Sequence, residues 1–259
     1  MVLGFAAKGA PGVSLGIWSM LPCWPRPIIG AEADPSGGSW ALTHGLSWDP
    51  GLSDLAAEQA VITDEMIERC SIRVAASIRV VCAPKEPVLV RRSLDWFDGR
   101  LAAWPEDLDV LVDAGRFNGS HPMLGRADAI VVWCRTDPQG LGATAALLGS
   151  LERDVRPGVV VRIVTVGDRP YTSAESVEAL ADLAGPRLTV RFGAALPFDP
   201  RLADVLASGG RKAGRLSAAW FGAMTGEIAA STAHRPSSPA EPVGATLGRV
   251  TLQSGGLVS

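Results

Sequence analysis

Residues 7–14, Ala-Lys-Gly-Ala-Pro-Gly-Val-Ser, hold the most informative pattern in the chain. They follow a short apolar run, Val2–Ala6, which is typical of a buried strand, and they lead into an apolar stretch, Val13–Cys23, which predicts a helix. A strand, a glycine-rich turn and a helix in this order can hold a phosphate group. The turn directs backbone N–H groups inward, and the helix N-terminus adds the positive end of its dipole. The opening of the chain therefore predicts an anion-binding loop.

The loop departs from the phosphate-binding consensus G-x-x-x-x-G-K-[ST] at two positions. Gly12 and Ser14 fit the last glycine and the hydroxyl, but Ala7 stands at the first glycine and Val13 at the lysine. The backbone N–H groups from Gly9 to Ser14 can still hold a phosphate. A glycine-rich turn between a strand and a helix can equally be a turn without a ligand.

Two later apolar runs end in acidic residues. Residues 27–34 end in Glu32-Ala33-Asp34, and residues 108–115 end in Asp113-Ala114-Gly115. In open α/β sheets, ligands bind outside the carboxyl ends of the strands. A carboxylate at such a place can orient an attacking water, or it can hold the water shell of Mg²⁺. Both acids also have a simpler interpretation as turn residues, because a proline follows Asp34 and a glycine closely follows Asp113.

The rest of the chain alternates strands with helices. This alternation predicts an α/β fold of the P-loop NTPase type, with a doubly wound, mostly parallel sheet of six or seven strands and helices on both faces. One β-rich segment is expected at 72–82, a last strand at 188–192, and a helix with Ser173 as its N-cap after the strand at 158–166. Residues 1–230 are expected to form the domain. Residues 231–259, rich in Ser, Pro, Gly, Thr and Ala, predict a disordered tail.

Composition excludes several other classes of protein. A net charge of −3 argues against a global basic field for nucleic acid or anionic lipid. The apolar N-terminal residues have no basic region before them and are interrupted by glycine and proline, so a signal peptide is not expected, nor is a transmembrane helix. The four cysteines have no C-x-x-C spacing and suit a reduced, cytoplasmic setting. His44, His121 and His234 lack metal-ligand spacing and are expected at the surface or in turns.

The pattern K-G-[GA]-x-G-x-[ST] that begins at Lys8 resembles the deviant Walker A motif of the ParA/MinD family of ATPases, in particular an actinobacterial subgroup with K-G-x-P-G-V-[ST]. The resemblance implies that Lys8 reaches the nucleotide of the partner across a dimer interface. It also implies that Asp34 orients the attacking water, as the second acid of an acidic segment. Ser14 is expected to ligate Mg²⁺, and Asp113, in a Walker B-like segment, to hold the water shell of that ion.

Two later loops extend the resemblance to the base of the nucleotide. Asp168, after the strand at 158–166, stands near the family's position for an Asn or Asp that recognises adenine. Pro197, in Leu196-Pro197-Phe198-Asp199, resembles the family loop that lies over the base. The predicted nucleotide-binding residues are Lys8, Gly9, Ala10, Pro11, Gly12, Val13, Ser14, Leu15, Asp168 and Pro197, with Lys8 and Asp34 as the catalytic candidates.

The resemblance implies a nucleotide-binding switch. Such a protein binds ATP and Mg²⁺, forms a homodimer, hydrolyses ATP slowly and positions a cellular complex in chromosome or plasmid partitioning, at the division site or in pilus machinery. Val13, in place of the lysine that contacts the β- and γ-phosphates, favours an alternative, a pseudo-ATPase scaffold that keeps the fold and its protein partner without turnover. A third alternative, a metabolic P-loop enzyme, has no substrate motif to support it. Neither a membrane-binding helix nor a nucleic-acid surface is indicated.

Overall fold

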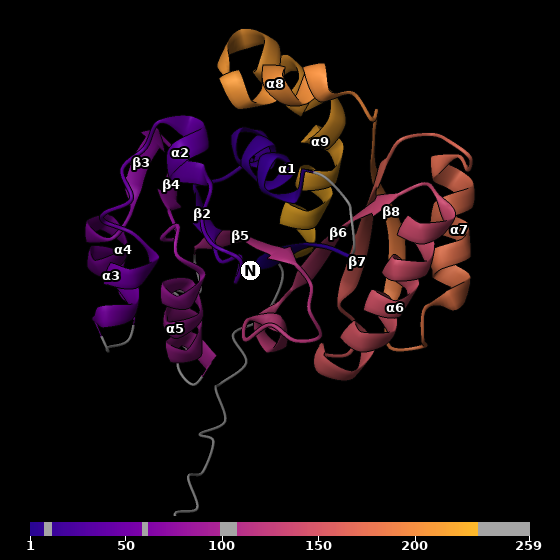
Figure 1. Ribbon diagram of the computed structural model, residues 1–259, viewed down its shortest axis with the longest axis horizontal. Helices are drawn as coiled ribbons and strands as arrows, with labels where there is room; N and C mark the ends of the chain where they lie inside the picture. Colours follow the sequence, from indigo (N-terminus) through magenta and orange to yellow (C-terminus); the bar gives the residue numbers. More distant parts are fainter. Residues whose placement is uncertain (8–11, 59–61, 99–107, 233–259) are drawn as a thin grey trace, which may run out of the picture.

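The structure is a computed structural model that describes residues 1–7, 12–58, 62–98 and 108–232. Within these residues, eight strands form one sheet in the order β3-β4-β2-β5-β1-β6-β7-β8 (Figure 1). All neighbouring pairs are parallel except β3 and β4. The predicted α/β fold with a doubly wound, mostly parallel sheet is confirmed.

The strands and helices follow the predicted alternation. The strands are β1 (Val2–Ala6), β2 (Ile28–Glu32), β3 (Ile72–Ala75), β4 (Ile78–Val81), β5 (Asp109–Arg116), β6 (Ala129–Arg135), β7 (Val160–Val166) and β8 (Thr189–Leu196). The α-helices are α1 (Val13–Met20), α2 (Trp40–His44), α3 (Leu52–Ala57), α4 (Asp64–Arg69), α5 (Pro87–Asp98), α6 (Pro138–Asp154), α7 (Ser173–Leu183), α8 (Pro200–Ser208) and α9 (Gly210–Thr232). Among the described residues there are also the 3₁₀ turns η1 (Leu21–Cys23) and η3 (Leu124–Arg126).

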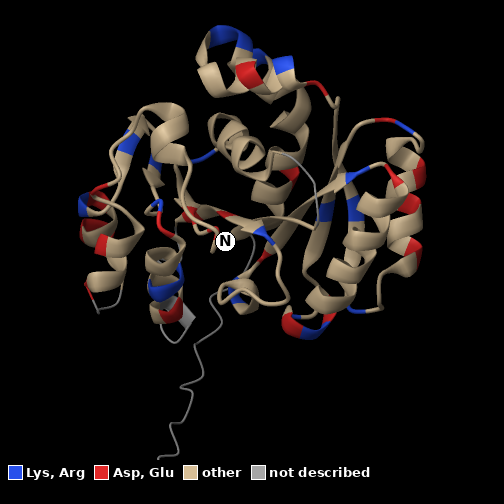
Figure 2. Ribbon diagram, in the orientation of Figure 1, with Lys and Arg blue, Asp and Glu red and all other residues tan. Residues whose placement is uncertain are grey.

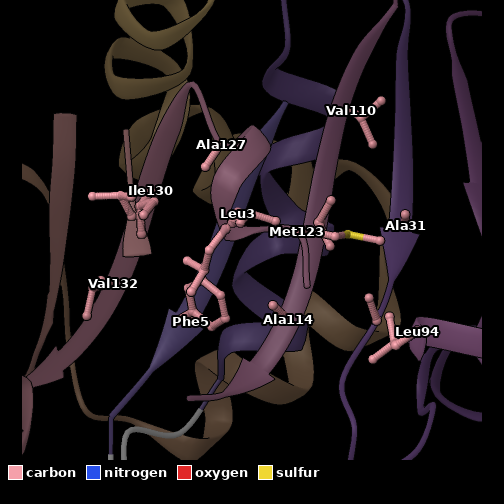
Figure 3. Packing of buried hydrophobic residues seen from close by; sticks show 14 of the residues in the cluster. Leu3, Phe5, Ala31, Leu94, Val110, Ala114, Met123, Ala127, Ile130 and Val132 are labelled. Carbon is pink, nitrogen blue, oxygen red and sulfur yellow. The ribbon is translucent and has the colours of Figure 1, made fainter. Parts of the chain in front are cut away.

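The two faces of the sheet bury separate apolar clusters. On one face, Leu3 and Phe5 of β1 pack with side chains from α3 to α7, and Figure 3 shows part of this cluster around the central strands. On the other face, side chains of α1, α2 and α9 pack against the sheet around the fully buried Trp133. The central strands β1, β5 and β6 are therefore covered on both sides, as their nearly unbroken apolar sequences require.

Several predicted elements differ from those observed. Residues 72–82 form an antiparallel hairpin, β3–β4, because the chain turns at Ala76 and Ser77. The N-cap of α7 is Thr172, whose hydroxyl accepts a hydrogen bond from the N–H of Glu175, and Ser173 is the first helical residue. The last strand, β8, is longer than the predicted 188–192. The hairpin raises the number of described strands to eight, above the six or seven expected.

Helix α9 closes the domain and ends at Thr232, two residues beyond the predicted boundary at 230. Phe221, Met224 and Ile228 are buried against the sheet. Near the end of the helix, Arg26 donates a hydrogen bond to the Ala229 carbonyl (3.0 Å). The predicted tail lies outside the described residues from 233 onward.

The domain boundary leads to a test by truncation. We expect a chain that ends after Thr232 to melt within about 2 °C of the full chain, because residues 233–259 contain few large apolar side chains to bury. Thermal unfolding followed by circular dichroism measures the difference. A control that ends after Gly222 loses the buried Met224 and Ile228 and should melt far lower. A fall of more than about 5 °C for the first truncation would contradict the boundary.

None of the helices in the described ranges is long and apolar enough to cross a lipid bilayer. The cysteines are unpaired: Cys70, Cys82 and Cys134 are buried and Cys23 is half-buried. Burial raises the pKa of the Cys82 thiol to about 12, which suits a small core residue rather than a nucleophile.

Candidate functional site

The carboxyl ends of β1, β2 and β5 meet at one edge of the sheet. In the register of the sheet, Asp113 of β5 lies opposite Gly4 of β1 on one side and Glu32 of β2 on the other. A cavity of about 410 Å³ opens beyond this edge, between α1, α2 and α8. It is lined by Ala6, Gly12, Val13, Ser14, Leu15, Asp34, Ser39, Trp40, Thr43, His44, Gly115, Arg116, Ala203, Asp204 and Ala207. Five of the predicted site residues (Gly12, Val13, Ser14, Leu15 and Asp34) therefore line one cavity.

Helix α1 begins at the cavity without a side-chain cap. Gly12 is its N-cap in the left-handed region (φ 93°), where a glycine is favoured. Since a glycine has no side chain to accept from them, the first-turn N–H groups of α1 are left to donate to an anion. Val13, at the position of the consensus lysine, packs into the apolar cluster and is only 6% exposed. The predicted Lys8, Gly9, Ala10 and Pro11 lie outside the described residues.

Asp113 is fully buried behind the cavity. Its Oδ1 atom accepts a hydrogen bond from the Gly115 N–H (3.0 Å), whereas Oδ2 has no partner. Burial raises the pKa of this carboxyl to about 7, with smaller contributions in the same direction from Glu32 and Asp34. The nearby Ser14 hydroxyl lowers the pKa in part, although no hydrogen bond of normal geometry reaches Oδ2. Burying a carboxylate oxygen without a hydrogen-bond partner costs free energy. A metal-bound water that donates to Oδ2 would remove this cost.

Asp34 follows β2 and begins a tight turn. Its Oδ1 atom accepts a hydrogen bond from the Ser36 N–H (2.8 Å), and its carbonyl accepts one from Gly37 (3.0 Å). The interpretation of Asp34 as a turn residue is thus correct, yet the side chain also lines the cavity. The carboxylate lies directly against Gly115, where a Cβ atom would approach Asp34 Cγ to 2.0 Å. The glycine of the Asp-x-Gly segment is therefore needed to make room for the second acid.

Glu32 has a structural role that its sequence pattern does not predict. It is 1% exposed, and burial raises the pKa of its carboxyl. Its Oε1 atom accepts hydrogen bonds from the Ser39 hydroxyl and the Trp40 N–H (3.0 Å), and Oε2 accepts one from the Ala83 N–H (3.1 Å). The two oxygens hold the start of α2 and the end of β4 at the cavity. Because both oxygens are engaged, Glu32 has little capacity left for a ligand.

A second cavity of about 310 Å³ adjoins the first and has a mostly apolar lining. Gly12, Leu15 and Ala203 line both cavities. The predicted Pro197 lies in the second cavity with Phe198, but Asp168 is exposed and lines neither. The structure thus brings Leu15 and Pro197 together beside the helix α1 and leaves Asp168 apart.

Two further cavity residues were not predicted as site residues. His44 stacks on Trp18 with ring centroids 3.7 Å apart, and burial lowers the pKa of its imidazole to about 4, so it is neutral at pH 7. His44 is half-buried rather than at the surface. His121, which does not line the cavity, is 5% exposed, and its Nε2 forms a hydrogen bond with the Ala33 carbonyl. Arg116, the last residue of β5, lines the cavity as an exposed cation. Its position directly after Asp113-Ala114-Gly115 is the sequence signal that could have identified it.

The donors present fit Mg²⁺ better than a metal that needs a protein cage. The described part of the chain has no group of three or more His, Cys, Asp or Glu side chains placed to hold a metal ion. Mg²⁺ does not need such a group, because it keeps several waters and takes one or two protein ligands beside phosphate oxygens. The Ser14 hydroxyl and the unpartnered Oδ2 of Asp113 are the residues that would hold it.

The arrangement of sheet and helices is that of the ParA and MinD ATPases of known structure. The chain is similar to a ParA family ATPase from Chlorobium tepidum (15% identity, TM-score 0.62, covering 90% of this chain and 99% of that chain). It is also similar to the cell division ATPase MinD of Pyrococcus furiosus (14% identity, TM-score 0.65, 89% and 97%). A third similar structure is a chain of the MinC:MinD cell division protein complex of Aquifex aeolicus (12% identity, TM-score 0.58, 91% and 96%).

No protein-family model matches the sequence, and neither does any curated protein. At these low identities the likeness in structure establishes the fold of the chain, a ParA/MinD-like α/β fold, and the resemblance in fold predicted from the sequence is confirmed.

Proposed function

We propose that the chain is a ParA/MinD-like nucleotide switch that binds ATP and Mg²⁺ in the 410 Å³ cavity. The proposal rests chiefly on the unpartnered Oδ2 of the buried Asp113 beside Ser14 at the start of α1. Uncapped N–H groups of α1 suit the phosphates, and the adjoining apolar cavity near Leu15 and Pro197 suits a flat base. When bound, Mg²⁺ would supply positive charge that stabilises the phosphate oxygens.

The protein residues would have separate tasks in this site. Ser14 ligates Mg²⁺, Asp113 holds the water shell of that ion, and Asp34 orients a water at the cavity wall. Asp34 suits this task because its Oδ1 is fixed by the Ser36 N–H while the carboxylate still lines the cavity. We propose slow hydrolysis, since the first position of α1 offers a buried valine where a lysine would stabilise developing charge.

The switch would act as a homodimer that positions a protein partner. Of the similar structures, one is a cell division ATPase and another is a MinC:MinD complex. By analogy with them, we propose that the ATP-bound dimer of this chain recruits one protein partner in the cytoplasm, within a machinery for partitioning or division. We also propose that the chain belongs to the subgroup with the deviant, lysine-first motif.

A second candidate function is a pseudo-ATPase scaffold. The observation that favours it is the burial of Val13 within the cluster that also contains Ile17 and Trp133. A side chain that is buried in the core cannot also contact a phosphate. In this case the fold would present a partner surface without turnover.

Calorimetric titration with ATP and a slowly hydrolysed analogue, with and without Mg²⁺, separates the two candidates. Micromolar binding that depends on Mg²⁺, together with phosphate release measured in a separate assay, supports the switch. Absence of binding at millimolar nucleotide excludes it and leaves the scaffold. Binding without measurable phosphate release also favours the scaffold, in a form that retains the ligand.

The role proposed for Lys8 is tested through dimerisation. We expect Lys8→Ala to abolish the ATP-dependent increase in mass measured by light scattering, because the lysine is proposed to neutralise the phosphate charge of the partner. Lys212→Ala, on the exposed side of α9, is the matched control and should dimerise like the native chain. An unchanged dimer fraction for Lys8→Ala would exclude a contact across the interface.

A further inference from the structure

A cation is needed in the proposed nucleotide site, and helix α1 does not provide one. Val13–Met20 contains no charged residue, so α1 is uniformly tan in Figure 2. The acidic side chains Asp34 and Asp204 both line the cavity, and Asp113 lies behind it. Lys8 is proposed to contribute only across the dimer interface, so within one protomer a polyphosphate in such surroundings requires positive charge besides the helix dipole and Mg²⁺.

Arg116 is the only cationic side chain that lines the cavity within the described residues, since His44 is neutral. It is exposed and makes no hydrogen bond or ion pair to a described residue, so its guanidinium is available to a ligand. Its backbone is fixed nonetheless: Arg116 lies opposite Ala6 in the sheet, and the next residue, Phe117, donates a hydrogen bond to the Ala6 carbonyl (2.9 Å). The backbone of Arg116 is therefore held rigidly at the end of β5, beside the last residue of β1.

A bulge in β5 sets the direction of this side chain. Between Gly4 and Ala6 of β1, the register with β5 shifts so that Asp113 and Arg116, three residues apart, face residues only two apart. The extra residue is accommodated at Gly115, which has a φ of 63°. A bulge breaks the strict alternation of side chains and commonly re-aims one next to a ligand site. As a result Asp113 and Arg116, although three residues apart, lie on the same face of the sheet at the end near the cavity. In a regular strand, residues three apart point to opposite faces.

We propose that Arg116 binds the terminal phosphates of the nucleotide, as the cation that Val13 does not provide; this inference rests on the proposed function. Arg116 lines only the 410 Å³ cavity, whereas Gly12 and Leu15 also line the apolar one. Arg116 thus lies away from the apolar cavity that suits the base. A triphosphate attached to a base in that cavity would extend toward Arg116. A guanidinium also presents paired N–H donors that match two phosphate oxygens.

The test compares the full native chain with Arg116→Gln, Arg116→Lys and Arg169→Gln, by calorimetric titration with ATP, AMP and inorganic tripolyphosphate, each with and without Mg²⁺. Arg169 is a matched control, since it is an exposed arginine after β7 at the same edge of the sheet and lines neither cavity. We expect Arg116→Gln to weaken ATP and tripolyphosphate by about ten- to hundredfold and AMP by less than about threefold. Arg116→Lys should recover part of the loss, and Arg169→Gln should bind like the native chain. Because Arg116 is exposed, each variant should keep the native melting temperature.

The outcomes separate the inference from the proposed function. Unchanged affinity of Arg116→Gln for ATP and tripolyphosphate would overturn the role of Arg116 and leave the nucleotide switch standing. Tripolyphosphate binding that depends on Arg116, with ATP bound no more tightly and without dependence on Mg²⁺, would support the phosphate contact and overturn the switch. Failure of the native chain to bind either ligand would overturn both.

Discussion

Substitution of Gly115 by alanine is expected to lower the free energy of unfolding by about 2–4 kcal/mol. Two costs combine. An alanine at a φ of 63° is strained by about 1–2 kcal/mol. Its Cβ would also lie 2.0 Å from Asp34 Cγ and 2.6 Å from Asp34 Cβ, so the turn at Asp34 must move and lose its hydrogen bond from the Ser36 N–H. For a domain of this size the loss corresponds to a fall in melting temperature of about 5–15 °C.

Two variants divide this effect into its parts. Gly142→Ala, in α6 with no atom within 4 Å of the added Cβ, is the matched control and should not lower the melting temperature. Adding Asp34→Ala to Gly115→Ala removes the closest overlap, with Cγ, and should recover part of the loss, leaving the backbone strain and the 2.6 Å approach to the Cβ of residue 34. A native melting temperature for Gly115→Ala alone would contradict the observed packing of the two segments.

The fold could be predicted from the sequence because its elements have strong local patterns. The central strands are continuous apolar runs, and their alternation with helices permits few arrangements besides a parallel sheet. The hairpin β3–β4 escaped prediction because Ala76-Ser77 is a weak turn signal inside a β-rich segment. Thr172 and Ser173 are both good N-caps, and only the reciprocal bonds between Thr172 and Glu175 distinguish them.

The site was harder to predict than the fold. Asp34 and Asp113 were predicted because each follows an apolar strand, and Gly12 and Ser14 were predicted because they match two positions of the phosphate-binding consensus. The role of Glu32 depends on donors from Ser39, Trp40 and Ala83, up to 51 residues away in the chain, which no local pattern reveals. Arg116 lies at the cavity because of the bulge in β5, and a bulge is a property of two paired strands rather than of one segment.

Asp113→Asn is expected to remove the Mg²⁺ dependence of ATP affinity and, at the same time, to stabilise the unliganded domain. The amide is neutral and nearly the same size, and its Oδ1 can still accept the Gly115 N–H. It cannot hold the water shell of the ion as a carboxylate does, so titrations with and without Mg²⁺ should give the same affinity. Asp168→Asn, at an exposed acid that lines neither cavity, is the matched control and should keep the dependence.

The stabilising effect should grow with pH. Burial raises the pKa of Asp113 from 3.8 to about 7, so between these values the unfolded chain releases a proton that the folded chain retains. The native domain therefore loses stability as the pH rises through this range, by at most about 4 kcal/mol, and the loss is complete above pH 7. The asparagine variant escapes this loss, and its advantage in melting temperature should increase from pH 5 to pH 7.5 and then level off. An advantage that is constant with pH would mean that the Asp113 carboxylate does not titrate in this range, and a retained Mg²⁺ dependence would remove it from the metal site.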